Sequence, residues 1–313
     1  MTDAYGKYIY LIKEKTMGFR FKGIYAPLTT PFKDEAVYTE KLRENIQKYN
    51  AFDLSGYVIS GSTAESVYLT DDEVESLVQA AKDTAESNKH IIVGTAREST
   101  KITLEFSRRM EDLGIDATLI RTPSYFKALM TPESLKKHYL TIADQVKIPL
   151  IIYHIPRYTG VNLTPELLVE LSRHEKIAGI KDSSGNMAFL DRVIPHLDPD
   201  FDYLLGAGSM LFPGIIMGAC GGILALADVA TPQCIRLYEL SISKQWEEAK
   251  ALQYALVPLN QALTAEHGIP AIKYALDQIG LFGGPCRLPL QPLEDMIKQK
   301  IRKILHDLRL KPE

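Results

Sequence analysis

The chain has few cysteines and no long apolar run, and these absences exclude several classes of protein. Its 313 residues include three cysteines, Cys220, Cys234 and Cys286, without CxxC or metal-ligand spacing. We therefore expect reduced thiols and neither disulfides nor a metal site. No run approaches the ~18 apolar residues that a membrane helix requires. Residues 1–17 lack the apolar region of a signal peptide and carry Asp and Glu, which favours a cytoplasmic protein.

An excess of charge is also missing, since 36 Lys and Arg stand against 39 Asp and Glu. A near-neutral balance does not favour a broad phosphate-binding surface or an anionic membrane partner, so neither nucleic acid nor a membrane is expected as a ligand. Met17 stands just before the first convincing strand. Residues 1–17 are therefore interpreted as an N-terminal extension, with translation starting at Met1 or at Met17.

Eight short β-rich runs alternate with helical patterns from about residue 21. They begin at Gly23, Gly56, Ile91, Ala117, Ile148, Ile177, Tyr203 and Gly221. Strand–helix units at this spacing, with strands that are nearly continuous in apolar character, predict an α/β fold, the (β/α)8 TIM barrel. A doubly wound open sheet is the main competitor, but the GxGxxG fingerprint after the first strand is absent, and Gly206-Ala-Gly208 is too weak to replace it.

Helix starts between the runs carry recognisable caps. Thr70 to Glu73 forms a capping box, and Thr131 and Thr164 each precede a proline at the first helical position. After the eighth run the pattern is helical throughout, for instance over 245–263 and 293–308. We therefore expect a barrel over 18–229 and an appended C-terminal helical bundle over 230–313.

One lysine stands in an unusual place, at the end of a short buried strand predicted over Ile177–Ile180. Lys181 would leave bulk water there, and desolvation lowers the pKa of a lysine, which makes the amine a nucleophile near neutral pH. The alternative is a strand-end lysine that extends its amine to solvent. In a barrel the catalytic face lies at the carboxyl ends of the strands, which places Lys181 on that face.

The other residues at these strand ends are mainly hydroxyls, glycines and aromatics. An aspartate pair and a histidine cluster are missing, which disfavours two-carboxylate chemistry and metal-assisted hydrolysis. A lone lysine among hydroxyls suits carbonyl chemistry through an imine. Tyr153 ends the neighbouring strand and could relay protons, although it could also be a core tyrosine. Ser62 and Thr63 could hold a carboxylate, although Ser62 to Glu65 also resembles a capping box.

Five motifs in register resemble the dihydrodipicolinate synthase / N-acetylneuraminate lyase family of class I Schiff-base pyruvate aldolases, over about residues 20–305. They are GSTAES from Gly61, TPSYF from Thr122, YHIPxxTG from Tyr153, GIKDSSG from Gly179 and GGPCRLPL from Gly283. The resemblance implies an enzyme without a cofactor, with Lys181 as the Schiff-base lysine and Tyr153 as the proton relay. It also implies that Ser62 and Thr63 bind the pyruvate carboxylate and that the backbone around Gly206 and Ile223 lines the pocket.

The resemblance extends to assembly and to the branch of the family. It implies a homotetramer, a dimer of dimers, in which Tyr125 reaches toward a neighbour's site. Tyr158 stands where the synthases typically carry an arginine for aspartate semialdehyde, and Arg157, one residue earlier, is expected to point elsewhere. Ser183 supplies a hydroxyl, as in the aldolase and lyase branches, that can bond a substrate hydroxyl.

These departures favour an aldolase that cleaves a 4-hydroxy-2-oxo acid, either 4-hydroxy-2-oxoglutarate or a 2-keto-3-deoxy sugar acid, to pyruvate and an aldehyde. Gly206 to Ser209 lacks the acidic pair of the sialic acid lyases, so a long sugar acid is disfavoured. Three alternatives stay open: a 4-hydroxy-tetrahydrodipicolinate (dihydrodipicolinate) synthase, a 2-keto-3-deoxy acid dehydratase, and a barrel that binds a keto acid without turnover.

Overall fold

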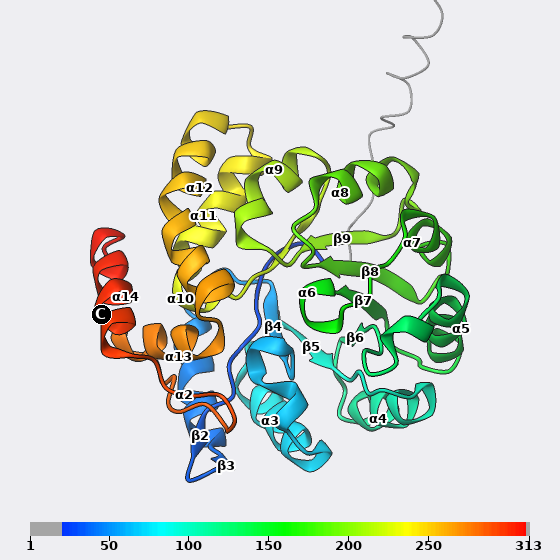
Figure 1. Cartoon of the computed structure of the whole chain (residues 1–313), viewed down its shortest axis with the longest axis horizontal. Helices are drawn as coiled ribbons and strands as arrows, with labels where there is room; N and C mark the ends of the chain where they lie inside the picture. The colour runs from blue at the N-terminus through cyan, green and yellow to red at the C-terminus, as the bar shows by residue number, and fades with distance from the viewer. Residues whose placement is uncertain (1–20, 311–313) are drawn as a thin grey trace, which may run out of the picture.

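A closed barrel of eight parallel strands forms the centre of the molecule (Figure 1). The structure, a computed structural model, describes residues 21–310, so the expected extension over 1–17 lies outside the described residues. The strands are β1 Gly23–Ala26, β4 Gly56–Ile59, β5 His90–Gly94, β6 Ala117–Arg121, β7 Leu150–His154, β8 Ile177–Asp182, β9 Asp202–Leu205 and β10 Gly221–Ile223. Each predicted run supplies one of these strands, and the predicted (β/α)8 barrel is confirmed.

Strand order follows the chain, and β1 closes the ring against β10. On β7 and β8, Tyr153 pairs in register with Lys181, and His154 with Asp182. Successive side chains of a strand point to opposite faces. Tyr153 belongs to the apolar cluster inside the barrel, so Lys181 shares this interior face, while His154 and Asp182 face the surrounding helices.

Helices cover the outside of the barrel. They are α2 Thr39–Tyr49, α3 Asp71–Thr84, α4 Thr100–Asp112, α5 Pro132–Ala143, α7 Pro165–Leu171, α8 Met187–Val193, α9 Leu211–Ile216 and α11 Thr231–Ile242. The predicted caps are present: the side chains of Thr70, Thr131 and Thr164 each accept a backbone N–H in the first turn of α3, α5 and α7. These caps satisfy amides that a helix start leaves without a partner.

Short elements occupy the loops. The strands β2 Phe32–Lys33 and β3 Ala36–Val37 form a separate ribbon, and two short helices are α6 Pro156–Thr159 and α10 Leu226–Val229. The 3₁₀ turns are Ser62–Ala64, Ser66–Tyr68, Lys127–Leu129, Ile194–His196 and Gly208–Met210. Among the described residues, no helix combines the length and the apolar character needed to cross a membrane.

The C-terminal region is helical only in part. It contains α12 Trp246–Asn260, a π-helix over Gln261–Glu266, α13 Ile269–Gln278 and α14 Asp295–Asp307, with α13 packed against α10 (Figure 1). The prediction of helix throughout is wrong for residues 279–294, which form no helix. This stretch is rich in glycine and proline, which are unfavourable inside helices. The division into a barrel over 18–229 and a helical region over 230–313 stays a prediction.

Candidate active site

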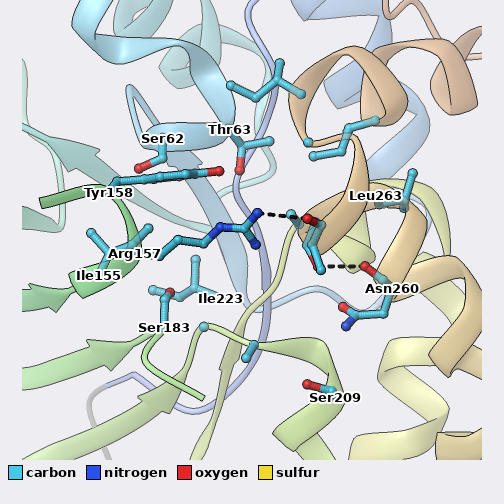
Figure 2. A pocket seen from close by; sticks show the side chains of 18 of the residues that line it. Ser62, Thr63, Ile155, Arg157, Tyr158, Ser183, Ser209, Ile223, Asn260 and Leu263 are labelled. Carbon is cyan, nitrogen blue, oxygen red and sulfur yellow. Dashed lines mark hydrogen bonds between the residues drawn. The ribbon is translucent and has the colours of Figure 1, made fainter. Parts of the chain in front are cut away.

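A cavity of about 360 Å³ opens at the carboxyl ends of the barrel strands. Seven of the eight predicted site residues line it, and they are Ser62, Thr63, Tyr153, Lys181, Ser183, Gly206 and Ile223. Figure 2 shows several of the lining side chains, which come from different strands and from the C-terminal helices. The eighth, Tyr125, is 80% exposed on the surface and does not line the cavity, so its expected role in a neighbour's site stays a prediction.

Lys181 is the only lysine that lines this cavity within residues 21–310, and its side chain is 3% exposed. Burial lowers its pKa to about 7, although the charge of Asp228 acts in the opposite direction. Desolvation destabilises the ammonium form, so a large share of the amine is unprotonated at neutral pH. The alternative of a strand-end lysine that extends to solvent is wrong for this structure.

Asp228 is a buried acid near this amine. Both of its carboxyl oxygens lack a hydrogen-bond partner within residues 21–310. Burial raises the pKa of Asp228, and Lys181 lowers it by less. The carboxyl group is therefore held in its uncharged form, because a buried carboxylate without partners is strongly unfavourable. Asp228 lies on α10, just after β10, and the sequence analysis assigned it no role.

Tyr153 lies against Lys181 inside the barrel. Its side chain is 5% exposed, and the Lys181 Nζ atom is 4.4 Å from its ring centroid. The phenol oxygen is 3.4 Å from Ser62 Oγ. Burial raises the pKa of Tyr153, while hydrogen bonds with Ser62 and Ser183 lower it by less. The phenol thus keeps its proton at neutral pH and can donate it to an oxygen that reacts beside Lys181.

Ser62 and Thr63 sit on the 3₁₀ turn that follows β4. The alternative in which Ser62 to Glu65 is a capping box is wrong, since Ser62–Ala64 is a single turn without a side-chain cap. Glu65 instead turns into the protein and pairs with Lys273 at 2.6 Å. With this cap absent, Ser62 and Thr63 line the cavity, and their hydroxyls remain able to bind a carboxylate.

Arg157 lines the cavity, and the expectation that it points elsewhere is wrong. It follows β7 on the helical turn Pro156–Thr159, and its Nη2 atom donates a hydrogen bond to the Ala265 carbonyl at 2.8 Å (Figure 2). Tyr158 also lines the cavity and is exposed at its mouth. A helical turn lets two adjacent side chains line the same cavity. The cavity therefore contains the guanidinium of Arg157, although Tyr158 stands at the position where the synthases that this chain resembles typically carry an arginine.

The C-terminal helices complete the cavity wall. Asn260, Gln261 and Thr264, at the junction of α12 and the π-helix, line the cavity. Sequence analysis missed these residues because they belong to no motif and reach the barrel only through packing of the distant helices. A π-turn inside a helix frequently marks a functional site. The π-helix would have pointed to these residues, but the spacing of apolar residues in the sequence does not reveal it.

A buried cluster of side chains on the outer face of the barrel joins the ends of the strands that carry Tyr153 and Lys181. His154 Nδ1 lies 2.8 Å from Asp182 Oδ1, and the Tyr203 hydroxyl donates to Asp182 Oδ2 at 2.6 Å. Burial alone would raise the pKa of Asp182, but hydrogen bonds and the charge of His154 lower it overall. Asp182 therefore stays ionised and links β7, β8 and β9 next to the catalytic face.

Comparisons with known proteins identify the family of this chain. Residues 20–308 match the family described as the dihydrodipicolinate synthetase family. The 4-hydroxy-tetrahydrodipicolinate synthase of Methanopyrus kandleri is 33% identical over 300 residues, covering 95% of this chain and 99% of the relative. That of Methanosarcina mazei is 33% identical over 290 residues, covering 92% and 98%.

Solved structures give the same answer. Dihydrodipicolinate synthase from Aquifex aeolicus superposes with a TM-score of 0.89 at 28% identity and covers 94% of this chain and 100% of its own. The pyruvate complex of the Acinetobacter baumannii enzyme has a TM-score of 0.88 at 30% identity and covers 92% and 99%. The chain therefore belongs to the dihydrodipicolinate synthetase family, whose members are class I, pyruvate-dependent lyases that act through a lysine Schiff base.

Proposed function

We propose that the protein is a lyase in which Lys181 forms an imine with pyruvate and joins it to, or releases it from, a small aldehyde that carries a carboxylate. The observation that carries this proposal is the buried Lys181 amine, with its pKa lowered to about 7 by burial, in a cavity shared with Tyr153 and Ser62. This arrangement unites a nucleophile, a proton donor and a carboxylate anchor.

The steps follow from these groups. The unprotonated Lys181 amine attacks the pyruvate carbonyl carbon, and the nitrogen loses a proton as the oxygen gains one. Tyr153 protonates the resulting hydroxyl, which leaves as water and gives the iminium. The Tyr153 phenolate then takes a proton from the methyl carbon, which yields an enamine. The enamine adds to the aldehyde carbon, and Tyr153 gives this proton to the aldehyde oxygen. Water then hydrolyses the imine and restores Lys181, and the reverse sequence cleaves the same bond.

The names of the relatives favour aspartate semialdehyde as the aldehyde, because the curated proteins of Methanopyrus kandleri and Methanoculleus marisnigri that this chain resembles are 4-hydroxy-tetrahydrodipicolinate synthases. The structure offers a cation for its carboxylate in Arg157, which lines the same cavity as Lys181. A guanidinium binds carboxylates in a bidentate manner. Arg157 therefore supports the synthase reaction, which the sequence analysis gave as an alternative to the aldolase. It does so although Tyr158 stands where the synthases typically carry an arginine.

A second candidate is cleavage of a 4-hydroxy-2-oxo acid such as 4-hydroxy-2-oxoglutarate. Ser183 lines the cavity two residues after Lys181, with a hydroxyl that can bond a substrate hydroxyl. A 2-keto-3-deoxy acid fits the same interaction, for cleavage or for dehydration, since all three reactions share the imine. Glyoxylate, the other product from 4-hydroxy-2-oxoglutarate, also carries a carboxylate that Arg157 can bind.

Two measurements test the proposal. Borohydride added with pyruvate should leave the reduced pyruvyl mass on Lys181, and the adduct should be missing in Lys181→Ala. Turnover of aspartate semialdehyde with pyruvate, of 4-hydroxy-2-oxoglutarate and of keto-deoxy-gluconate epimers then identifies the second substrate. Folded protein without an adduct would exclude the imine. A keto-acid-binding barrel without turnover would instead bind pyruvate equally well after Lys181→Ala.

We also propose the homotetramer, with Tyr125 contributing to a neighbour's site. Tyr125 and Phe126 are exposed side by side, and the Glu98 carboxylate accepts the Tyr125 N–H at 2.9 Å, which fixes this loop. Assembly varies among relatives, since one solved structure is called a monomeric variant. Hybrids of Tyr125→Phe with Lys181→Ala should regain activity if Tyr125 acts across subunits, and hybrids without activity would exclude it. The cytoplasmic location stays a prediction.

A further inference from the structure

A buried ion pair joins the turn that carries Ser62 and Thr63 to the C-terminal helices. Lys273 on α13 places its Nζ atom 2.6 Å from Glu65 Oε1. Both residues are only 1% exposed. Glu65 directly follows the turn Ser62–Ala64, so the pair lies immediately behind the two hydroxyls that face the cavity.

A second layer of contacts holds this pair in place. Residues 283–287, which we call the strap, run over Lys273 and Glu65. Glu65 Oε2 accepts the backbone N–H of Arg287 at 2.9 Å, and Lys273 Nζ donates to the Pro285 carbonyl at 2.7 Å. Gly283 packs so closely that an added Cβ would lie 1.9 Å from the Lys273 carbonyl oxygen. The strap therefore leaves the two charged groups little freedom to move.

The Arg287 side chain extends the same connection. Its guanidinium donates to both carboxylate oxygens of Glu73, at 2.9 and 2.6 Å, and to the Tyr68 carbonyl at 2.7 Å. Both partners belong to the segment that follows Glu65 in the chain. The strap thus holds the connection between β4 and α3 at Glu65 and beyond it, as far as the first turn of α3.

The pair is poorly explained by stability alone. Removing two charges from water is costly, and well-packed apolar residues often serve as well in the same place. What the pair does fix is the backbone of Glu65, whose φ of +59° lies in the left-handed region that side chains other than glycine rarely adopt. A hydrogen bond from Thr30 Oγ1 to the Ala64 carbonyl, at 2.7 Å, fixes the preceding residue.

We propose that Glu65 and Lys273 are positioning residues that hold Ser62 and Thr63 where they bind the carboxylate of the 2-oxo acid. This rests on the proposed function, because the carboxylate-binding role of the two hydroxyls is part of it. The pair touches no reacting atom. Because Lys273 lies on α13, the binding of pyruvate at the end of β4 then depends on the C-terminal helices, which lie outside the barrel.

The variants Glu65→Gln, Lys273→Met and the double variant test this role. A single change leaves one charge buried without its partner, which can prevent folding, whereas the double variant leaves none. In the folded double variant, the pyruvate concentration that gives half of the maximal borohydride trapping should be about tenfold or more above that of the wild type. Trapping at saturating pyruvate should change by less than about threefold, because Lys181 and Tyr153 keep their environment.

Lys89→Met is the matched control. Lys89 is also buried and donates to two backbone carbonyls, those of Phe52 and Leu54, but it precedes β5 and so lies at the opposite end of the barrel. It should lower the stability without changing the half-saturating pyruvate concentration. A folded double variant with a half-saturating concentration within about twofold of the wild type would overturn the proposal.

The wild-type protein separates this inference from the proposed function. If it gives no borohydride adduct, the proposed imine is wrong, and calorimetric binding of pyruvate then tests the positioning role alone. Weaker binding by the double variant supports the role, and equal binding by the two proteins contradicts it.

Discussion

The Nζ atom of Lys181 lies 4.4 Å from the centroid of the Tyr153 ring, and the two residues are partners in register on adjacent strands. One residue further along the same strands, His154 and Asp182 form the next pair and face the opposite side of the sheet. The alternation of a strand therefore places a reactive pair inside the barrel and a structural pair behind it. Changes to the two pairs should have separable effects.

The first prediction concerns pH. Because burial lowers the pKa of Lys181 to about 7, imine formation with pyruvate should increase as the pH rises through this value and level off above it. Below the pKa the rate should fall by about tenfold per pH unit, since only the unprotonated amine attacks. Borohydride trapping across the pH range measures this, with near-ultraviolet circular dichroism to show that the protein stays folded. A profile that is flat down to about pH 4 would contradict an amine nucleophile.

The second prediction concerns the phenol of Tyr153. Tyr153→Phe keeps the ring beside Lys181 but removes the proton donor, so kcat should fall by about 10²- to 10⁴-fold. Tyr139→Phe is the matched control. Tyr139 is buried on α5, outside the barrel, and its hydroxyl donates to the Ile120 carbonyl of β6. That variant should lose some stability and keep its kcat. Equal kcat values for the two variants would exclude Tyr153 as the relay.

Sequence reasoning succeeded where the signal is local or repeated. Eight apolar runs give eight strands, and parallel strands bring their carboxyl ends to one edge, so Lys181, Tyr153 and Ser62 could be placed together without coordinates. It failed where a contact depends on packing. The sequence of Ser62 to Glu65 matches a capping box, and only the fold shows that Glu65 meets Lys273 from α13.

Arg157 shows a different limit. Matching positions to a family motif assigns one residue to one role, but a helical turn after β7 brings both Arg157 and Tyr158 to the cavity. Asn260 and Thr264 could not be predicted at all, because their approach to the cavity depends on how α12 packs against the barrel.

The third prediction tests Arg157 as the cation that binds the aldehyde's carboxylate. Arg157→Met should raise the KM of the aldehyde substrate by about tenfold or more, since a bidentate guanidinium has no replacement there. Pyruvate trapping at Lys181 should be unchanged. Arg192→Met, which removes an exposed arginine paired with Glu166 on the outside of the barrel, should leave both unaffected. If Arg157→Met leaves the KM of the aldehyde unchanged, another group binds this carboxylate.

The fourth prediction concerns stability and Asp182. This carboxylate accepts from the Tyr203 hydroxyl at 2.6 Å and from the Ser184 N–H and hydroxyl, both at 3.0 Å, while His154 Nδ1 lies at 2.8 Å. Asp182→Asn keeps the shape but removes the charge that these groups surround. The free energy of unfolding at neutral pH should fall by about 3 kcal/mol, the loss expected when a buried, hydrogen-bonded charge is removed.

The pH dependence gives this loss a sign. Although burial acts to raise it, the pKa of Asp182 is lowered overall by its hydrogen bonds and by His154, so the folded protein binds a proton there less readily than the unfolded chain. The stabilisation is therefore complete above the unfolded pKa of about 3.9 and is lost as the pH falls through the lower, folded value. Urea unfolding should show a difference between wild type and Asp182→Asn that is constant at neutral pH and shrinks in acid. Asp144→Asn is the control, because Asp144 forms an exposed pair with His174, and it should change the free energy of unfolding little at any pH. An equal loss of this free energy in both variants would mean that the buried cluster does not stabilise the ends of these strands.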